Sequence, residues 1–291
     1  MIKRVSAIVI NGKIMKWNIL HRTRYDYAEA VRDNVNEVCL EPMTGPEQTL
    51  ESFLLKVLPA SRLTHLGDPF SNRISHFEIT EAHNYLVVEA QSRVITHPRA
   101  PWPAAAQLCS LAEMRARPKI ADGVDYLSAS RFVESSPEAG RLAAEATSGQ
   151  ADVWQAVLAL MAFIHGHFKY ESYSTHVHTH MSEVLRDRRG VCQDFAHVLI
   201  GLCHELGIPA RYVSGYLATE SASATHAWME VFIPNHGWRA LDPTHNRQTD
   251  ESYVKIGHGR DYSDVPPVSG KYRGTLIHRM TVTVDIKPVQ A

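Results

Sequence analysis

The sequence lacks an excess of charge of either sign, and it lacks any long apolar run. Its 30 lysines and arginines are balanced by 31 acidic residues, which leaves a formal net charge of −1 over 291 residues. Proteins that bind nucleic acid typically carry a basic stripe, so this balance argues against that class of partner. No apolar stretch approaches the roughly 18 residues that a membrane-spanning helix needs, so no membrane partner is expected either.

Cysteine is also scarce. The four cysteines, Cys39, Cys109, Cys192 and Cys203, have the spacing of neither a zinc motif nor a disulfide scaffold. Two of them would share one helix face, but about three turns apart, which is too far for a disulfide. Reduced thiols are typical of a reducing compartment, so we expect a cytoplasmic protein. The charged and apolar start, residues 1–14, is shorter than a signal peptide and is interpreted as a dispensable extension.

The first third of the chain has the composition of short β-strands. Five β-rich runs are separated by turns that contain glycine, proline or asparagine: 17–27, 34–40, 51–57, 73–79 and 85–94. Short strands at such spacing favour an antiparallel β-sandwich. A proline-containing stretch at 98–106 indicates a linker. At roughly 100–200 residues per domain, we expect a β-sandwich N-terminal domain over 16–100 and a second domain over 101–291.

The second domain has helical patterns first and strand patterns later. Asp152 can cap a helix that runs to about residue 165, and a short helix is expected at 181–186. A further helix begins at Cys192 and ends at Gly207. The strands expected after it are 210–217, 227–233, 237–241 and, near the end of the chain, 275–287. Helices and strands that are separated along the chain indicate an α+β fold.

Cys192 stands where a helix begins, two residues after Gly190, which lets the chain turn sharply. The start of a helix has unpaired backbone N–H groups and the positive end of the dipole, and both favour a thiolate over a thiol. The same N–H groups can stabilise an oxyanion on a substrate. A lone cysteine is more often a small core residue, so its position alone does not establish a nucleophile.

A β-hairpin can supply the other two groups of a catalytic triad. The hairpin consists of the expected strands 227–233 and 237–241. Its three-residue loop, 234–236, would pair Ile233 with Gly237. The same register puts Trp228 opposite Asp242, which makes Asp242 the diagonal neighbour of His226. Such diagonal residues lie about 7–8 Å apart, within reach of a His–Asp hydrogen bond. A slip of one residue would put the two side chains on opposite faces. With the cysteine, this base and carboxylate form the arrangement of nucleophilic catalysis.

Four blocks around these residues carry a family resemblance. They are RGVCQDFAH at 189–197, GIPARYVSGY at 207–216, HAW at 226–228 and WRALDPT at 238–244. In this order and spacing they resemble the bacterial transglutaminase-like family, which belongs to the papain-like cysteine enzymes. HRTRYDY at 21–27 and NRISHF at 72–77 resemble the N-terminal β-sandwich domain of that family, and GRDYSDVPP at 259–267 resembles its late region. The resemblance extends from about residue 16 to the end. It implies a papain-like, transglutaminase-core α+β domain.

The resemblance also implies residue roles. Cys192 would be the nucleophile, His226 the general base and then acid, and Asp242 the orienting carboxylate. The enzyme would act without a cofactor on an amide bond of a peptide or protein, through a thioester. Two departures from the animal cross-linking enzymes favour hydrolysis. Those enzymes have tryptophan directly after the cysteine, where this chain has Gln193, and no dense acidic loop indicates a calcium site.

The sequence leaves two alternatives open. One is a protein-glutamine amine transferase, which would use the same thioester. The other is a papain-like cleft that binds a peptide without turnover. Inactive relatives usually lose a member of the triad, and this chain keeps all three, which disfavours the binding module.

Other residues could line the cleft or bind an oxyanion: Gln193, Tyr170, Tyr173 and Trp228. The two tyrosines precede the cysteine at a distance where family members often place an oxyanion donor, with simple packing as the equal alternative. We interpret Trp228 and Trp238 as core or cleft wall. Asp194 is expected to satisfy the helix N-terminus rather than to tune the thiol.

The histidines at 176, 178 and 180 alternate, so a strand would put three imidazoles on one face. Their spacing matches no common structural zinc motif. We interpret them as a solvated loop near the cleft and expect no metal site.

Overall fold

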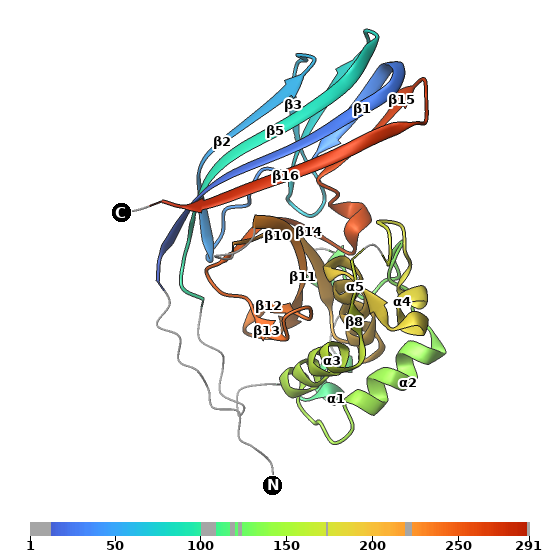
Figure 1. Ribbon diagram of the computed structural model, residues 1–291. Coiled ribbons are helices and arrows are strands. Elements are labelled where there is room, and N and C mark those ends of the chain that lie inside the picture. The colour runs from blue at the N-terminus through green and yellow to red at the C-terminus, as the bar shows by residue number, and fades with distance from the viewer. Residues whose placement is uncertain are drawn as a thin grey trace.

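The computed structural model describes residues 13–99, 109–116, 120–121, 124–172, 174–218 and 223–289. It consists of an antiparallel β region followed by an α+β region, so the predicted fold class is confirmed (Figure 1). Most of the expected N-terminal extension and most of the expected linker lie outside the described residues. Among the described helices, none combines the length and the apolar character needed to cross a bilayer.

A curled antiparallel sheet of seven strands forms the N-terminal part (Figure 1). Its main path has the order β2-β5-β1-β4-β3. The bounds are β1 (Met15–Val38), β2 (Gln48–Leu58), β3 (Thr64–Gly67), β4 (Arg73–Ile79) and β5 (His83–Thr96). The strands expected at 17–27 and 34–40 are one strand, β1, because register shifts beyond Asp26 let it bend and pair first with β5 and then with β4. The expected sandwich is therefore one sheet that curls on itself.

The last strands of the chain complete this sheet. They are β15 (Val268–Arg273) and β16 (His278–Pro288), and both pair with β1. The β1–β16 pairing is continuous from Trp17 opposite Pro288 to Tyr27 opposite His278. The strand expected at 275–287 is thus present, with its partner at the other end of the sequence. In space, the N-terminal sheet includes chain from both sides of residue 100.

One buried helix, α5 (Cys192–Glu205), lies at the centre of the α+β region. The other helices are α1 (Leu111–Arg115), α2 (Pro137–Ala146), α3 (Val153–His167) and α4 (Met181–Asp187). Helices α2, α3 and α4 contact α5, which also packs on β10 and β11 (Figure 1). Every residue from Asp194 to Cys203 is buried as a result. Asp152 caps α3 as expected, because its carboxylate accepts a hydrogen bond from the Gln155 N–H at 2.8 Å.

A sheet of five antiparallel strands, in the order β13-β12-β11-β10-β14, covers α5. The bounds are β10 (Ala210–Ala218), β11 (Ser223–Ile233), β12 (Gly237–Asp242), β13 (Arg247–Gln248) and β14 (Tyr253–Gly259). Short elements complete the fold: β6 (Ile120–Ala121), β7 (Val124–Asp125), β8 (Lys169–Tyr170), β9 (Arg189–Gly190) and the 3-10 turn η2 (Tyr262–Asp264). The β11–β12 hairpin has the expected register, with Ile233 opposite Gly237 and Met229 opposite Leu241.

Two amide side chains from the N-terminal region, Gln48 at the start of β2 and Asn72 just before β4, bind the backbone of the edge strand β14. Gln48 accepts a hydrogen bond from the Lys255 N–H at 2.8 Å and donates to the Lys255 carbonyl at 2.7 Å. Asn72 likewise accepts from the His258 N–H at 2.9 Å and donates to its carbonyl at 2.8 Å. An edge strand has backbone groups without a strand partner. The two amides satisfy such groups and join the two regions of the fold.

We expect Asn72→Ala to lower the free energy of unfolding by about 2–4 kcal/mol. The substitution leaves a buried N–H and a buried carbonyl of His258 without the amide, and an unpaired buried group costs about 1–3 kcal/mol. Urea denaturation measures the change. Asn84→Ala, at an exposed position of β5, is the matched control and should change stability by less than about 0.5 kcal/mol. Equal stability of the two variants would contradict this role of Asn72.

Candidate active site

Cys192 is the first residue of α5, directly after the short strand β9. Asp194 stabilises the N-terminus of α5 as expected. Its carboxylate accepts hydrogen bonds from the Val191 N–H at 2.8 Å and from the Thr175 hydroxyl at 2.6 Å. Gly190 is required here, since a Cβ at that position would lie 2.7 Å from the Asp194 side chain. The thiol is therefore held beside the first backbone N–H groups of a long helix, which have no carbonyl partner within the helix.

His226 lies on β11, and its ring contacts both other residues of the expected triad. Its Nε2 is 2.8 Å from Asp242 Oδ2. The Cys192 thiol lies close enough to this ring to raise its pKa. The His226 side chain is 8% exposed and that of Asp242 is fully buried. The structure thus brings together a thiol, an imidazole and a carboxylate that are far apart in the sequence.

The buried Asp242 carboxylate accepts five hydrogen bonds. Oδ2 accepts from His226, from His245 Nδ1 at 2.7 Å and from the Tyr253 hydroxyl at 2.7 Å. Oδ1 accepts from the backbone N–H groups of Thr244 at 2.9 Å and His245 at 3.3 Å. Sequence reasoning missed His245 and Tyr253. His245 had a local signal, because an aspartate that begins a turn commonly binds backbone N–H groups two and three residues later. Tyr253 comes from β14 and had no local signal.

His226 and Asp242 shift each other's pKa values. Burial lowers the pKa of His226, but hydrogen bonds to Asp242 and Cys192 outweigh burial and raise it to about 9. Burial raises the pKa of Asp242, but hydrogen bonds from His226 and His245 outweigh burial and hold it well below its ordinary value. The protonated imidazole is therefore the favoured form at neutral pH. Because the folded-state pKa of His226 is raised, its contribution to stability is complete below pH 6.5 and is lost as pH rises through about 9.

Among the described residues, His226, Asp242 and His245 form the one group whose spacing suits a metal ion, with ligand atoms within 4.8 Å of one another. These same atoms already bind each other in the hydrogen bonds described above, so the group is fully accounted for as a hydrogen-bond network. The alternating histidines form no such group. His180 instead stands at the start of α4, where its N–H donates to the Glu183 carboxylate at 3.1 Å.

Two of the expected cleft residues lie near the thiol. The Gln193 amide donates to the Val177 carbonyl at 3.2 Å, which ties the loop before α4 to the start of α5. Tyr170 is 51% exposed, and its ring packs edge-on against Phe195 at 6.1 Å between centroids. Burial and the neighbouring Cys192 raise the pKa of Tyr170, so its hydroxyl stays protonated and can donate.

The remaining aromatic candidates lie in different places. Trp228 is 2% exposed, and its ring stacks on that of His226 at 6.3 Å between centroids and packs edge-on against Tyr253 at 5.4 Å, so it supports the triad from the core. Trp238 lies under the Arg211 guanidinium, 3.9 Å from the ring centroid. Tyr173 lies outside the described residues.

Known proteins share both parts of this architecture. Residues 17–95 match the bacterial transglutaminase-like N-terminal region, and residues 140–243 match the transglutaminase-like superfamily. An uncharacterised protein of Mycobacterium tuberculosis is 31% identical over 309 aligned positions, which cover 94% of this chain and 93% of the relative. The chain belongs to the bacterial transglutaminase-like family. Its fold and the order of its sequence blocks agree with the family resemblance expected from sequence.

Two further likenesses place this transglutaminase-like chain among known proteins. A crystal structure of a candidate cysteine protease from Cytophaga hutchinsonii has the same fold, with a TM-score of 0.75, 23% identity and coverage of 96% of this chain and 92% of that one. A protein-glutamine gamma-glutamyltransferase of Pseudomonas aeruginosa is 29% identical over 102 residues, which cover 30% of this chain and 15% of that protein.

We expect Asp242→Asn to lower the pKa of His226 from about 9 to below 8, because the negative charge that favours the imidazolium is removed. The pH titration of the His226 ring signals by NMR measures this change. Asp187→Asn, at an exposed position on α4, is the control and should leave the titration unchanged. A His226 titration near pH 9 in Asp242→Asn would show that the carboxylate does not set the charge of this ring.

Proposed function

We propose that this protein is a cysteine-nucleophile hydrolase that cleaves amide or peptide bonds through a thioester. The observation that carries the proposal is the imidazole of His226, which lies 2.8 Å from Asp242 and close enough to Cys192, at the start of α5, for the thiol to raise its pKa. A cysteine with an adjacent base, and a base with its own orienting group, is the general arrangement of an activated nucleophile. Peptide or protein amides are the proposed substrates. The cytoplasm is the proposed location, because Cys39, Cys192 and Cys203 take part in no disulfide.

Acylation begins from the form in which His226 already holds the proton and Cys192 is the thiolate. The thiolate attacks the carbonyl carbon of the substrate, and the carbonyl oxygen becomes an oxyanion. Backbone N–H groups in the first turn of α5 are placed to stabilise that charge. The C–N bond then breaks, and His226 gives its proton to the leaving amine. The product of this half is a thioester on Cys192 and a free amine.

Deacylation reverses the roles. His226, now neutral, takes a proton from a water molecule that attacks the thioester carbon. The C–S bond breaks, Cys192 leaves as the thiolate beside the protonated His226, and a carboxylic acid is released. Asp242 keeps its charge throughout and holds the imidazole in one orientation, with His245 and Tyr253 holding Asp242 in turn.

The surroundings of the Cys192 thiol favour water over an amine as the group that attacks the thioester. Water is present at tens of molar, so a transferase must shield the thioester or bind the amine in place. The residue after the cysteine is the polar Gln193, and its amide is turned to the Val177 carbonyl. Trp228, the tryptophan closest to the triad in sequence, is buried in the core. The alternative, an amine transferase, is supported by the segment similar to the Pseudomonas aeruginosa enzyme.

We expect Cys192→Ala to lower kcat/KM for peptide or amide hydrolysis by about 10⁴-fold or more, as loss of a triad nucleophile does elsewhere. Activity profiling on a library of peptides and amides identifies the substrate for this measurement. Cys203→Ala, on the same helix but fully buried, should keep the activity.

Cys192 should also react with an alkylating reagent much faster than the other cysteines in the native protein, and His226→Ala should slow this reaction. Absence of turnover, together with no preferential alkylation of Cys192, would favour the binding-module alternative instead.

The acceptor is tested by product partitioning. We expect an activated acyl donor to give mainly the free acid while a lysine analogue is titrated to low millimolar concentration. Each product is quantified by mass spectrometry, with Cys192→Ala as the blank for uncatalysed aminolysis. A majority of amine adduct at low millimolar amine would identify the protein as a transferase.

A further inference from the structure

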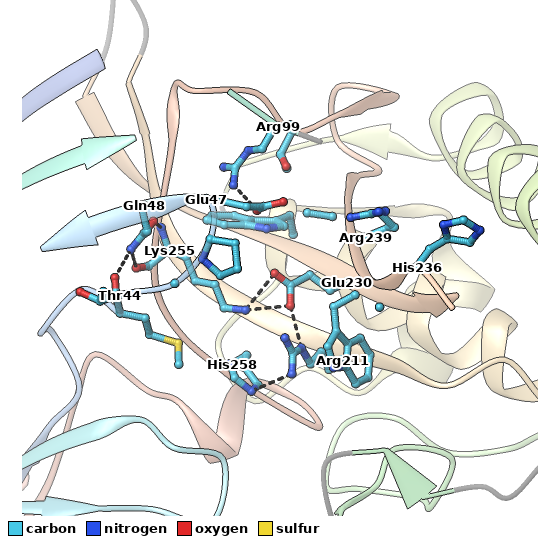
Figure 2. A pocket seen from close by; sticks show the side chains of 18 of the residues that line it. Thr44, Glu47, Gln48, Arg99, Arg211, Glu230, His236, Arg239, Lys255 and His258 are labelled. Atoms are coloured by element: carbon cyan, nitrogen blue, oxygen red, sulfur yellow. Dashed lines mark hydrogen bonds and ion pairs between the residues drawn. The ribbon is translucent and has the colours of Figure 1, made fainter. Parts of the chain in front are cut away.

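Two buried carboxylates on the five-stranded sheet are held by different kinds of cation. Glu230 lines a cavity of about 540 Å³ whose lining also includes residues 43–48 (Figure 2). It accepts hydrogen bonds from Arg211 at 2.6 Å and from Lys255 at 2.7 and 2.8 Å. Burial lowers the pKa of Lys255 to about 8, so both cations keep their charge in acidic solution. Asp242 is held instead by two histidines, whose charge can change between about pH 5 and 8.

The two histidines bound to Asp242 differ in their access to solvent. The side chain of His245 is 44% exposed, whereas that of His226 is 8% exposed. His245 Nδ1 lies 2.7 Å from Asp242 Oδ2, the same oxygen that accepts from His226. An ionised carboxylate can only accept, so Nδ1 carries a proton in this contact and Nε2 is the nitrogen that can gain one. Solvent can therefore protonate His245 without breaking its hydrogen bond to Asp242.

A proton on His245 changes the charge that acts on His226. The centroids of the two rings lie 5.3 Å apart, and both rings contact one carboxylate oxygen. Two positive charges at this separation repel each other, and the repulsion is stronger beside a buried carboxylate than it would be in bulk water. The single negative charge of Asp242 would also be shared between two imidazolium ions. Protonation of His245 therefore disfavours the protonated form of His226.

The other polar groups around this turn keep one charge state in acid or bind elsewhere. Tyr253 donates to the shared carboxylate oxygen at 2.7 Å, and burial raises its pKa, so the hydroxyl stays protonated. Arg247 donates to the Tyr253 hydroxyl at 2.9 Å, and its guanidinium stays charged. His165, from α3, lies with its Nδ1 3.2 Å from a backbone carbonyl of the turn. His245 is thus the exposed imidazole that directly contacts the carboxylate of the triad.

We propose that His245 is a positioning residue that acts through Asp242 and sets the charge of the nucleophile and its base. With His245 neutral, the full charge of Asp242 keeps the proton on His226, and Cys192 remains a thiolate. When solvent protonates His245 Nε2, the proton of His226 moves to the Cys192 sulfur, and the nucleophile becomes an unreactive thiol. The site is therefore inactivated in acid and recovers when His245 releases its proton. This inference rests on the nucleophile of the proposed function, but it does not require turnover.

The rate at which chloroacetamide alkylates Cys192, measured against pH, tests this role because the thiolate is the reactive form. His245→Asn puts an amide N–H in place of Nδ1–H, so it keeps the contact to Asp242 but cannot gain a charge. Near neutral pH it should react within about twofold of the unsubstituted chain. The acid midpoint of its rate profile should lie lower by at least about 0.5 pH unit. An unchanged or higher midpoint would overturn the proposal.

His165→Asn is the matched control, because it removes a histidine that binds a backbone carbonyl of the same turn. It should shift the midpoint by less than about 0.2 pH unit.

The unsubstituted chain gives a second test by NMR. The ring signals of His226 should change at the pH where His245 titrates, and His226 signals that stay constant through that titration would show that the two rings are not coupled. Neither measurement needs a substrate. A protein that hydrolyses no amide but shows both effects would refute the proposed function alone, and an active hydrolase without them would refute the role of His245 alone.

Discussion

The arrangement of the candidate site depends on one buried charge, the carboxylate of Asp242. A fully buried carboxylate is unfavourable unless hydrogen bonds compensate its lost hydration, and here five donors do so. These donors come from β11, from the turn after β12 and from β14. The same contacts that make the charge tolerable therefore fix the hairpin, the turn and the edge strand relative to one another. The orientation of His226 toward Cys192 follows from this network.

Local rules were sufficient for the parts of the structure that depend on neighbouring residues. The start of α5, its cap at Asp194 and the β11–β12 register all follow from short-range patterns, and the structure agrees with each of them. The register places His226 beside Asp242, and the packing of α5 on β11 brings Cys192 to them. The bend in β1 was missed, because two strands separated by a register shift look like two elements in sequence. The pairing of β1 with β16 could not be predicted, since strand alternation does not identify a partner.

Groups that meet only in three dimensions were also beyond sequence reasoning. Tyr253 reaches Asp242 from a strand that no local signal connects to it. The cluster of Arg211, Glu230 and Lys255 is spread over three strands, and charged residues in a sequence usually indicate exposed positions. Arg211 and Glu230 are direct neighbours across β10 and β11, but that pairing becomes visible only when the order of the strands is known. The cavity that they line depends in addition on the docking of residues 43–48.

The pairing of β1 with β16 has a consequence for the order in which the protein folds. One edge of the first part of β1 is covered by β5 and the other by β16. During synthesis β16 emerges after the entire α+β region, so β1 keeps an open edge while the rest of the chain is made. Open strand edges are sites of misassembly in partly folded chains. Until β16 leaves the ribosome, this edge of β1 is therefore a place where the nascent chain can pair wrongly.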